Sequence, residues 1–164
     1  MNLDGQTLCG LSDLRPVDEQ KLVKSGSEPD IMHGIQAILD TIAPGRFVCV
    51  ERKNLRGKSA ISKPVDLQIS LTGDLNKAAV AIEVANVNTT QLVGETCRLY
   101  CDSCPLKLLI LGDRNVPPQG KEQCEKLLAK LFGQDDICST PARVARFDED
   151  PIIEAALGDL LLIS

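Results

Sequence analysis

The chain has 164 residues, a formal net charge of −5 and 2% aromatic residues. This length suffices for one domain with a hydrophobic core, while the scarcity of aromatic side chains argues against a stacking platform for single-stranded nucleic acid. No apolar stretch is long enough to cross a membrane, and the N-terminus lacks the basic and apolar regions of a secretory signal. The seven cysteines, an odd number, then favour free thiols in a reducing cytoplasm.

In chain order, the expected elements form a single domain over residues 27–164, preceded by an N-terminal arm over residues 1–26. The first helix begins at Ser27, a capping residue followed by Pro29 in the first turn, and ends before Pro44. The remaining elements are three strands (47–51, 65–71 and 78–85), a helix (from Thr89 or Thr90 to about Cys101), a strand (106–111), a helix (121–132), a strand (143–147) and a last helix from residue 150.

The spacing of these elements predicts the topology of the sheet. Short connections join the first three strands, so these strands form an antiparallel meander, while the fourth follows a helix and should run parallel to the third. Nearly continuous apolar runs at 78–85 and 106–111 indicate interior strands. We therefore expect an α/β fold with a mixed central sheet, helices on both faces and an αβββαβ core.

The last helix is rich in apolar side chains, which indicates either docking on the sheet or a homodimer formed through this helix. The side chains concerned are Ile152, Ile153, Ala156, Leu157 and Leu160. Both alternatives bury the same stripe, so the sequence leaves the choice open.

Two acids stand within the apolar strands: Asp66 in the second and Glu83 in the third. Strand alternation puts Glu83 on one face with Ala81 and Ala85. A buried carboxylate is costly unless it is paired or bound to a metal, and two carboxylates on adjacent strands can hold a divalent cation together. The alternative is structural, with each acid at a strand end facing solvent or paired with an arginine.

The motif around these acids resembles that of the PD-(D/E)xK nuclease superfamily, also called restriction-endonuclease-like, over about residues 27–113. Pro64-Val65-Asp66 is similar to the family's Pro-Asp element with one residue inserted, and Glu83-Val84-Ala85 stands where the family has acid-x-Lys. The resemblance implies an endonuclease-like, metal-dependent hydrolysis of DNA phosphodiester bonds. It further implies Mg²⁺ or Mn²⁺ held by Asp66, Glu83 and the backbone carbonyl of Val84, an accessory acid at Glu28, and a further polar group at Gln91 or Glu95.

The chain departs from this family at Ala85, where the family has a lysine that orients or helps deprotonate the attacking water. Candidate replacements are Lys53, on the same face of the first strand as Glu51, and Gln68, two residues after Asp66. The competing interpretation is a catalytically degenerate nuclease fold that binds nucleic acid or a protein partner.

A basic stretch separates the first two strands. Residues 46–63 hold six basic residues against the single acid Glu51, a concentration that can contact DNA phosphates. The candidate contacts are Arg46, Arg52, Arg56, Lys58 and Lys63. The alternative is a solvated hairpin tip that keeps a sheet edge soluble.

Cys97, Cys101 and Cys104 form the other notable pattern. Their spacing is that of a three-cysteine iron–sulfur motif, and it also equals one face of a helix, as buried structural cysteines show. A thiol- or cluster-dependent protein is therefore a third hypothesis, beside the nuclease and the binding fold.

Overall fold

The computed structural model describes residues 26–52, 65–85, 89–112 and 116–162. Its elements are α2 (Glu28–Ile42), β2 (Phe47–Glu51), β3 (Leu67–Leu71), β4 (Asp74–Ala85), α3 (Thr89–Cys101), β5 (Leu106–Leu111), α4 (Pro118–Leu131), the 3-10 helix η3 (Ile137–Ser139), β6 (Ala142–Arg146) and α5 (Asp150–Leu161). The predicted α/β class is confirmed. The arm expected over residues 1–26 lies outside the described residues except for Gly26.

The five strands form one mixed sheet in the order β2-β3-β4-β5-β6. β2, β3 and β4 pair antiparallel and β5 runs parallel to β4, as predicted. β6 pairs parallel with β5 at the edge of the sheet. β4 begins at Asp74, earlier than expected, because its exposed first half continues the hairpin with β3 beyond the core. Its second half, Val80–Ala85, is buried in the middle of the sheet.

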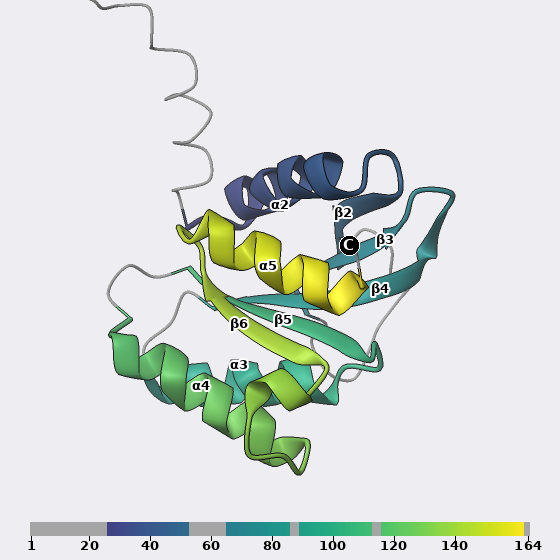
Figure 1. Cartoon of the computed structure of the whole chain (residues 1–164). Coiled ribbons are helices and arrows are strands. Elements are labelled where there is room, and N and C mark those ends of the chain that lie inside the picture. Colours follow the sequence, from purple (N-terminus) through teal and green to yellow (C-terminus); the bar gives the residue numbers. More distant parts are fainter. Residues whose placement is uncertain (1–25, 53–64, 86–88, 113–115, 163–164) are drawn as a thin grey trace, which may run out of the picture.

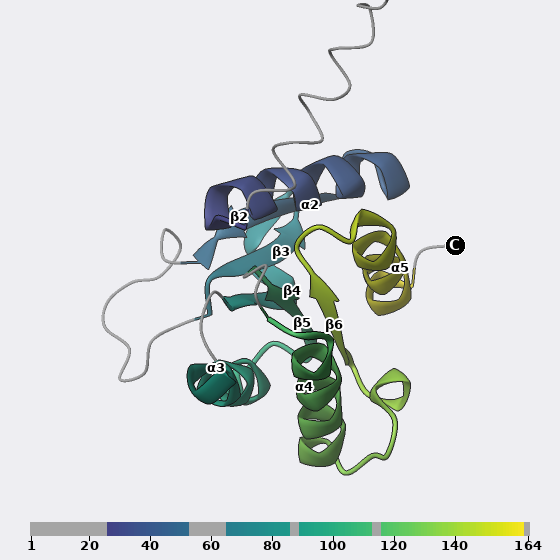
Figure 2. The same cartoon turned by 90° about the vertical axis from the view of Figure 1, so that its left-hand side faces the viewer.

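Helices cover both faces of this sheet, as expected (Figures 1 and 2). α2 and α5 lie on the face to which β4 contributes Val80, Ile82 and Val84. α3 and α4 lie on the opposite face, against Ala81 and Ala85. The alternation of β4 therefore divides the core into two layers, with the small alanines toward α3.

α5 docks on the sheet. Ile153, Ala156, Leu157 and Leu160 are buried in the same cluster as α2 and the strands. The stripe that indicated a homodimer is thus covered within the chain. Ile152 and Leu162 are exposed large apolar side chains at this helix, and the homodimer remains a prediction.

The buried face of α3 differs in part from the expected one. Apolar spacing predicts a core stripe of Leu92, Val93, Cys97 and Tyr100, of which Leu92 is buried, Cys97 and Tyr100 are half-buried and Val93 is exposed. The observed stripe is Leu92, Thr96 and Leu99. Thr96 and Leu99 each precede an expected position by one residue, which corresponds to a helix rotation of about 100°. This rotation turns Arg98 toward the sheet, where Glu83 lies.

Gly26 fixes where α2 begins. A Cβ on Gly26 would lie 1.9 Å from the carbonyl oxygen of Gly112, so glycine is required for this close approach. The Gly112 amide in turn donates to the carbonyl of Ala85 at 2.8 Å. The start of α2, which carries Glu28, therefore sits at the carboxyl ends of β4 and β5.

The side chain of Gln36 covers the outer edge of β2. Its Oε1 accepts from the Cys49 amide at 2.8 Å, and its Nε2 donates to the Phe47 carbonyl at 3.3 Å. These backbone groups point away from β3, so Gln36 takes the place of a neighbouring strand. This contact protects an edge that would otherwise be open to pairing with another chain.

Replacing Gln36 with alanine should lower the free energy of unfolding by about 1–2 kcal/mol, because two backbone groups lose their partner. Urea unfolding followed by circular dichroism measures the change. Gln123→Ala, at an exposed position of α4, is the matched control and should stay close to the wild type. Equal stabilities of the two variants would contradict the role assigned to Gln36.

Candidate functional site

Asp66 lies beside the peptide that carries the second acid. The pairing of Leu67 with Ile82 sets the register of β3 and β4, and it places Asp66, one residue before β3, next to residues 83 and 84. Asp66 Oδ2 accepts a hydrogen bond from the Val84 amide at 2.8 Å. Asp66, Glu83 and Val84, named below as the carboxylate site, are thus brought together at the junction of β3 and β4.

Glu83 forms a buried ion pair with a helix residue. Its side chain is 1% exposed, and Oε2 lies 2.5 Å from Nη1 of Arg98 on α3. The Arg98 side chain is 29% exposed, and its guanidinium offsets the cost of burying the carboxylate in the apolar sheet face. At Glu83 the structure therefore shows the structural alternative, an acid that is paired with an arginine.

Gln68 is held by hydrogen bonds within the sheet. Its Oε1 accepts from Nε of Arg52 at 2.8 Å, and its Nε2 donates to Ser70 Oγ at 2.7 Å and to the Leu75 carbonyl at 3.0 Å. Arg52 also forms an ion pair with Asp102, just beyond α3. Gln68 therefore ties β2 to the β3–β4 hairpin, and its amide is committed to these contacts.

Lys107 on β5 is a buried cation that sequence reasoning missed. Its Nζ donates to the carbonyls of Asp102 at 2.7 Å and Cys104 at 2.5 Å, where the negative end of α3 lies. Burial lowers the pKa of Lys107, and the nearby Asp102 offsets part of that shift.

Charged residues of the described part of the chain thus gather between the sheet and α3, and we call six of them the charged layer. Its members are Arg52, Asp66, Glu83, Arg98, Asp102 and Lys107. Two of its acids, Glu83 and Asp102, are each paired with an arginine of the protein.

The other predicted site residues are spread more widely. Glu28 lies at the carboxyl ends of β4 and β5, as described above, on the helix that covers the opposite face. Arg46 is exposed and stacks on the Phe47 ring, with its guanidinium carbon 5.2 Å from the ring centroid. It stands at the other end of β2 from Arg52, about 20 Å away at the rise of a strand.

The remaining candidates lie outside the described residues. They are Lys53, Arg56, Lys58 and Lys63. Of the predicted phosphate contacts, Arg52 is therefore the one that the structure brings to the carboxylate site: its amide donates to the Asp66 carbonyl at 3.0 Å.

The three clustered cysteines occupy three different environments. Cys97 is half-buried, Cys101 is exposed and Cys104 is buried, with Sγ 3.7 Å from the Ala78 carbonyl. Burial raises the pKa of Cys104. The three cysteines therefore do not share one buried face: Cys104 packs in the core, and Cys101 is an exposed thiol at the end of α3.

The donors of the carboxylate site match the chemistry of a hard divalent cation. Carboxylate and carbonyl oxygens are what Mg²⁺ and Mn²⁺ take as ligands, and Asp66, Glu83 and Val84 supply these. Within the described residues, no group of three or more histidine, cysteine, aspartate or glutamate side chains is arranged to hold a metal. A cation at this site would therefore rest on two acids and backbone or water oxygens.

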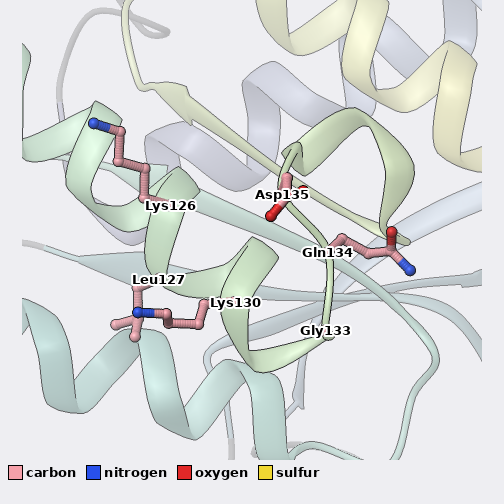
Figure 3. Close-up of a pocket in the computed structure, with 6 residues that line it drawn as sticks. All are labelled: Lys126, Leu127, Lys130, Gly133, Gln134 and Asp135. Atoms are coloured by element: carbon pink, nitrogen blue, oxygen red, sulfur yellow. The ribbon is translucent and has the colours of Figure 1, made fainter.

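A pocket of about 620 Å³ lies elsewhere, at the end of α4. α4 contributes Lys126, Leu127 and Lys130, and the turn that follows contributes Gly133, Gln134 and Asp135 (Figure 3). None of these residues belongs to the carboxylate site or to the charged layer. We assign no chemistry to this pocket.

Comparison with models of known protein families found no match, and comparison with curated protein sequences found none either. In the part of the chain that the structure describes, no helix combines the length and the apolar character needed to cross a membrane. What the protein does is therefore inferred from its side chains and their geometry.

The cysteine environments predict a pattern of thiol labelling. Cys101 and Cys138 are exposed and should react with iodoacetamide at pH 8. Cys49, Cys104 and Cys124 should stay unmodified, because burial raises the pKa of each thiol, that of Cys49 to about 12. Peptide mass spectrometry locates the label, and the same reaction in denaturant is the control. Fast labelling of Cys104 in the folded protein would contradict its assigned environment.

Proposed function

We propose that this chain is a restriction-endonuclease-like protein that hydrolyses DNA phosphodiester bonds with the help of Mg²⁺ or Mn²⁺. The observation that carries the proposal is the hydrogen bond from the Val84 amide to Asp66, because it holds one acid beside the peptide that bears the other. The order α2-β2-β3-β4-α3-β5 supports it as the αβββαβ core that this family resemblance implies.

In this proposal, Asp66, Glu83 and the carbonyl of Val84 hold the cation. When bound, the cation polarises the phosphate and lowers the pKa of a coordinated water. The register of β3 against β4 pre-positions the two acids, and Glu28 is the accessory acid at the same end of the sheet. Lys53, which follows β2 by two residues, is the candidate to hold or take the proton of the attacking water.

DNA is the proposed partner, with its phosphates contacted by basic residues of the connection between β2 and β3. The backbone of Arg52 lies directly beside Asp66, but its guanidinium is held by Gln68 and Asp102. In this proposal the phosphate contacts therefore fall to Arg56, Lys58 and Lys63, which follow in the same connection. Binding through such contacts weakens steeply as salt is raised. Arg46 stands at the far end of β2, so in this proposal it reaches a different part of the DNA backbone or none.

A second candidate function is a degenerate nuclease fold that binds without cutting. The ion pair of Glu83 with Arg98 favours it, because the acid is already balanced by a protein cation. The ion pair of Asp102 with Arg52 in the same charged layer has the same implication. In this case the fold keeps the carboxylates for stability, and the partner is nucleic acid or a protein.

A cleavage assay separates the two functions. Plasmid DNA with Mg²⁺ or Mn²⁺ should be cut by the wild type, and Asp66→Asn and Glu83→Gln should each lower the rate at least about a hundredfold, since a metal ligand contributes several kcal/mol. Both variants keep the shape of the side chain, and asparagine can still accept from the Val84 amide. Glu122→Gln, in an exposed ion pair on α4, is the control and should cut normally.

If no cleavage is seen, DNA binding by the same proteins still separates the two functions. DNA binding that persists in EDTA and in both acid variants, without cutting in any metal, would establish the degenerate function instead. Wild-type cleavage that survives Glu83→Gln would contradict the assignment of the carboxylate site.

A further inference from the structure

Arg98 stands where the charge that is missing at Ala85 would be needed. Ala85 follows Glu83 by two residues on the same face of β4, is 0% exposed and packs in the cluster that includes Leu92 of α3. A lysine at that position would have to displace the helix. The positive charge next to Glu83 comes instead from the helix itself, through Arg98.

The Arg98 side chain is also exposed enough to swing from Glu83 into solvent. It is 29% exposed, whereas the side chains of the neighbouring pair Arg52 and Asp102 are 12% and 9% exposed. Arg52 is further held by Gln68. The guanidinium of Arg98 can therefore leave Glu83 for solvent without opening the core, which the Arg52 pair cannot do.

Glu83, by contrast, is too deeply buried to stay charged without a partner. At 1% exposure, its carboxylate needs a positive group beside it to remain ionised. A divalent cation held by Asp66 and Glu83 would meet the guanidinium at the same carboxylate, where two positive groups repel each other. Cation and arginine are thus alternative partners of one acid.

We propose that Arg98 is a positioning residue that guards the carboxylate site, holding Glu83 in the absence of a divalent cation and giving it up when the cation binds. This inference rests on the proposed function. Because the cation has to displace the guanidinium, the measured metal affinity is lower than the site itself would provide. The released guanidinium stays tethered to α3 on the same face, where its planar donors suit a phosphate.

Titration calorimetry with Mn²⁺ alone, without DNA, tests this role of Arg98, which we call the guard: Arg98 holds Glu83 until a divalent cation displaces it. Arg98→Gln should bind Mn²⁺ at least about tenfold more tightly than the wild type, because a charged hydrogen bond to Glu83 no longer competes. Arg52→Gln is the matched control, since it removes the same charge from the same face without touching Glu83. Its affinity should change clearly less.

Three outcomes are decisive. Tighter binding in Arg98→Gln, lost again when Asp66→Asn is added, supports the guard. Equal binding in the wild type and Arg98→Gln overturns the guard while the proposed metal site stands. No binding at millimolar Mn²⁺ in either protein overturns the metal site, and the guard with it.

A second measurement covers the case in which Arg98→Gln fails to fold because Glu83 loses its partner. In wild-type protein, the side-chain Nε–H signal of Arg98 is followed by NMR during Mg²⁺ titration and is identified by its loss in Arg98→Lys. The guard predicts a shift of this signal that saturates with Mg²⁺ and is absent in Asp66→Asn. A signal that does not move while the amide of Val84 does would overturn the guard.

Discussion

A carboxylate buried in an apolar sheet requires a positive partner, and the α3 face of this protein is organised around that requirement. Glu83 sits in the buried second half of β4, between Ala81 and Ala85 on the same face, which let α3 approach closely. The guanidinium of Arg98 then fits between helix and strand. Removing one member of such a pair costs more than the pair contributes, because the other charge stays buried.

The same requirement extends along α3. Gln91, Glu95, Arg98 and Asp102 recur at i, i+4, i+7 and i+11, one polar stripe of the helix and the residue after it. Arg98 and Asp102 on this stripe meet Glu83 and Arg52, and Leu92, Thr96 and Leu99 fill the core beside them. Charge pairing thus helps to set the rotation of the helix, in addition to hydrophobic burial.

Much of the fold was predictable because it depends on local periodicity. The alternation along 78–85 places Glu83 among alanines, and the short connections specify the antiparallel meander. The placement of Asp66 follows from the same register. Arg98 was not predicted because α3 carries two overlapping stripes, and apolar spacing alone selected Leu92, Val93, Cys97 and Tyr100. The polar stripe from Gln91 to Asp102 was the signal that could have found it. The sequence around Lys107 contained no such signal. One lysine in an apolar strand does not indicate how deeply its side chain is buried, or which helix end its ammonium group caps.

The central claim is that Asp66 and Glu83 form a divalent-cation site at the junction of β3 and β4. Paramagnetic broadening of backbone amide NMR signals by substoichiometric Mn²⁺ tests it most directly, because the effect is confined to the surroundings of the ion. The account predicts early loss of the Leu67, Glu83 and Val84 signals, with those of Arg46 and Thr72 at the far end of the hairpin retained. Broadening centred on the exposed acids Glu122, Asp135 and Asp136, or no broadening at all, would contradict it.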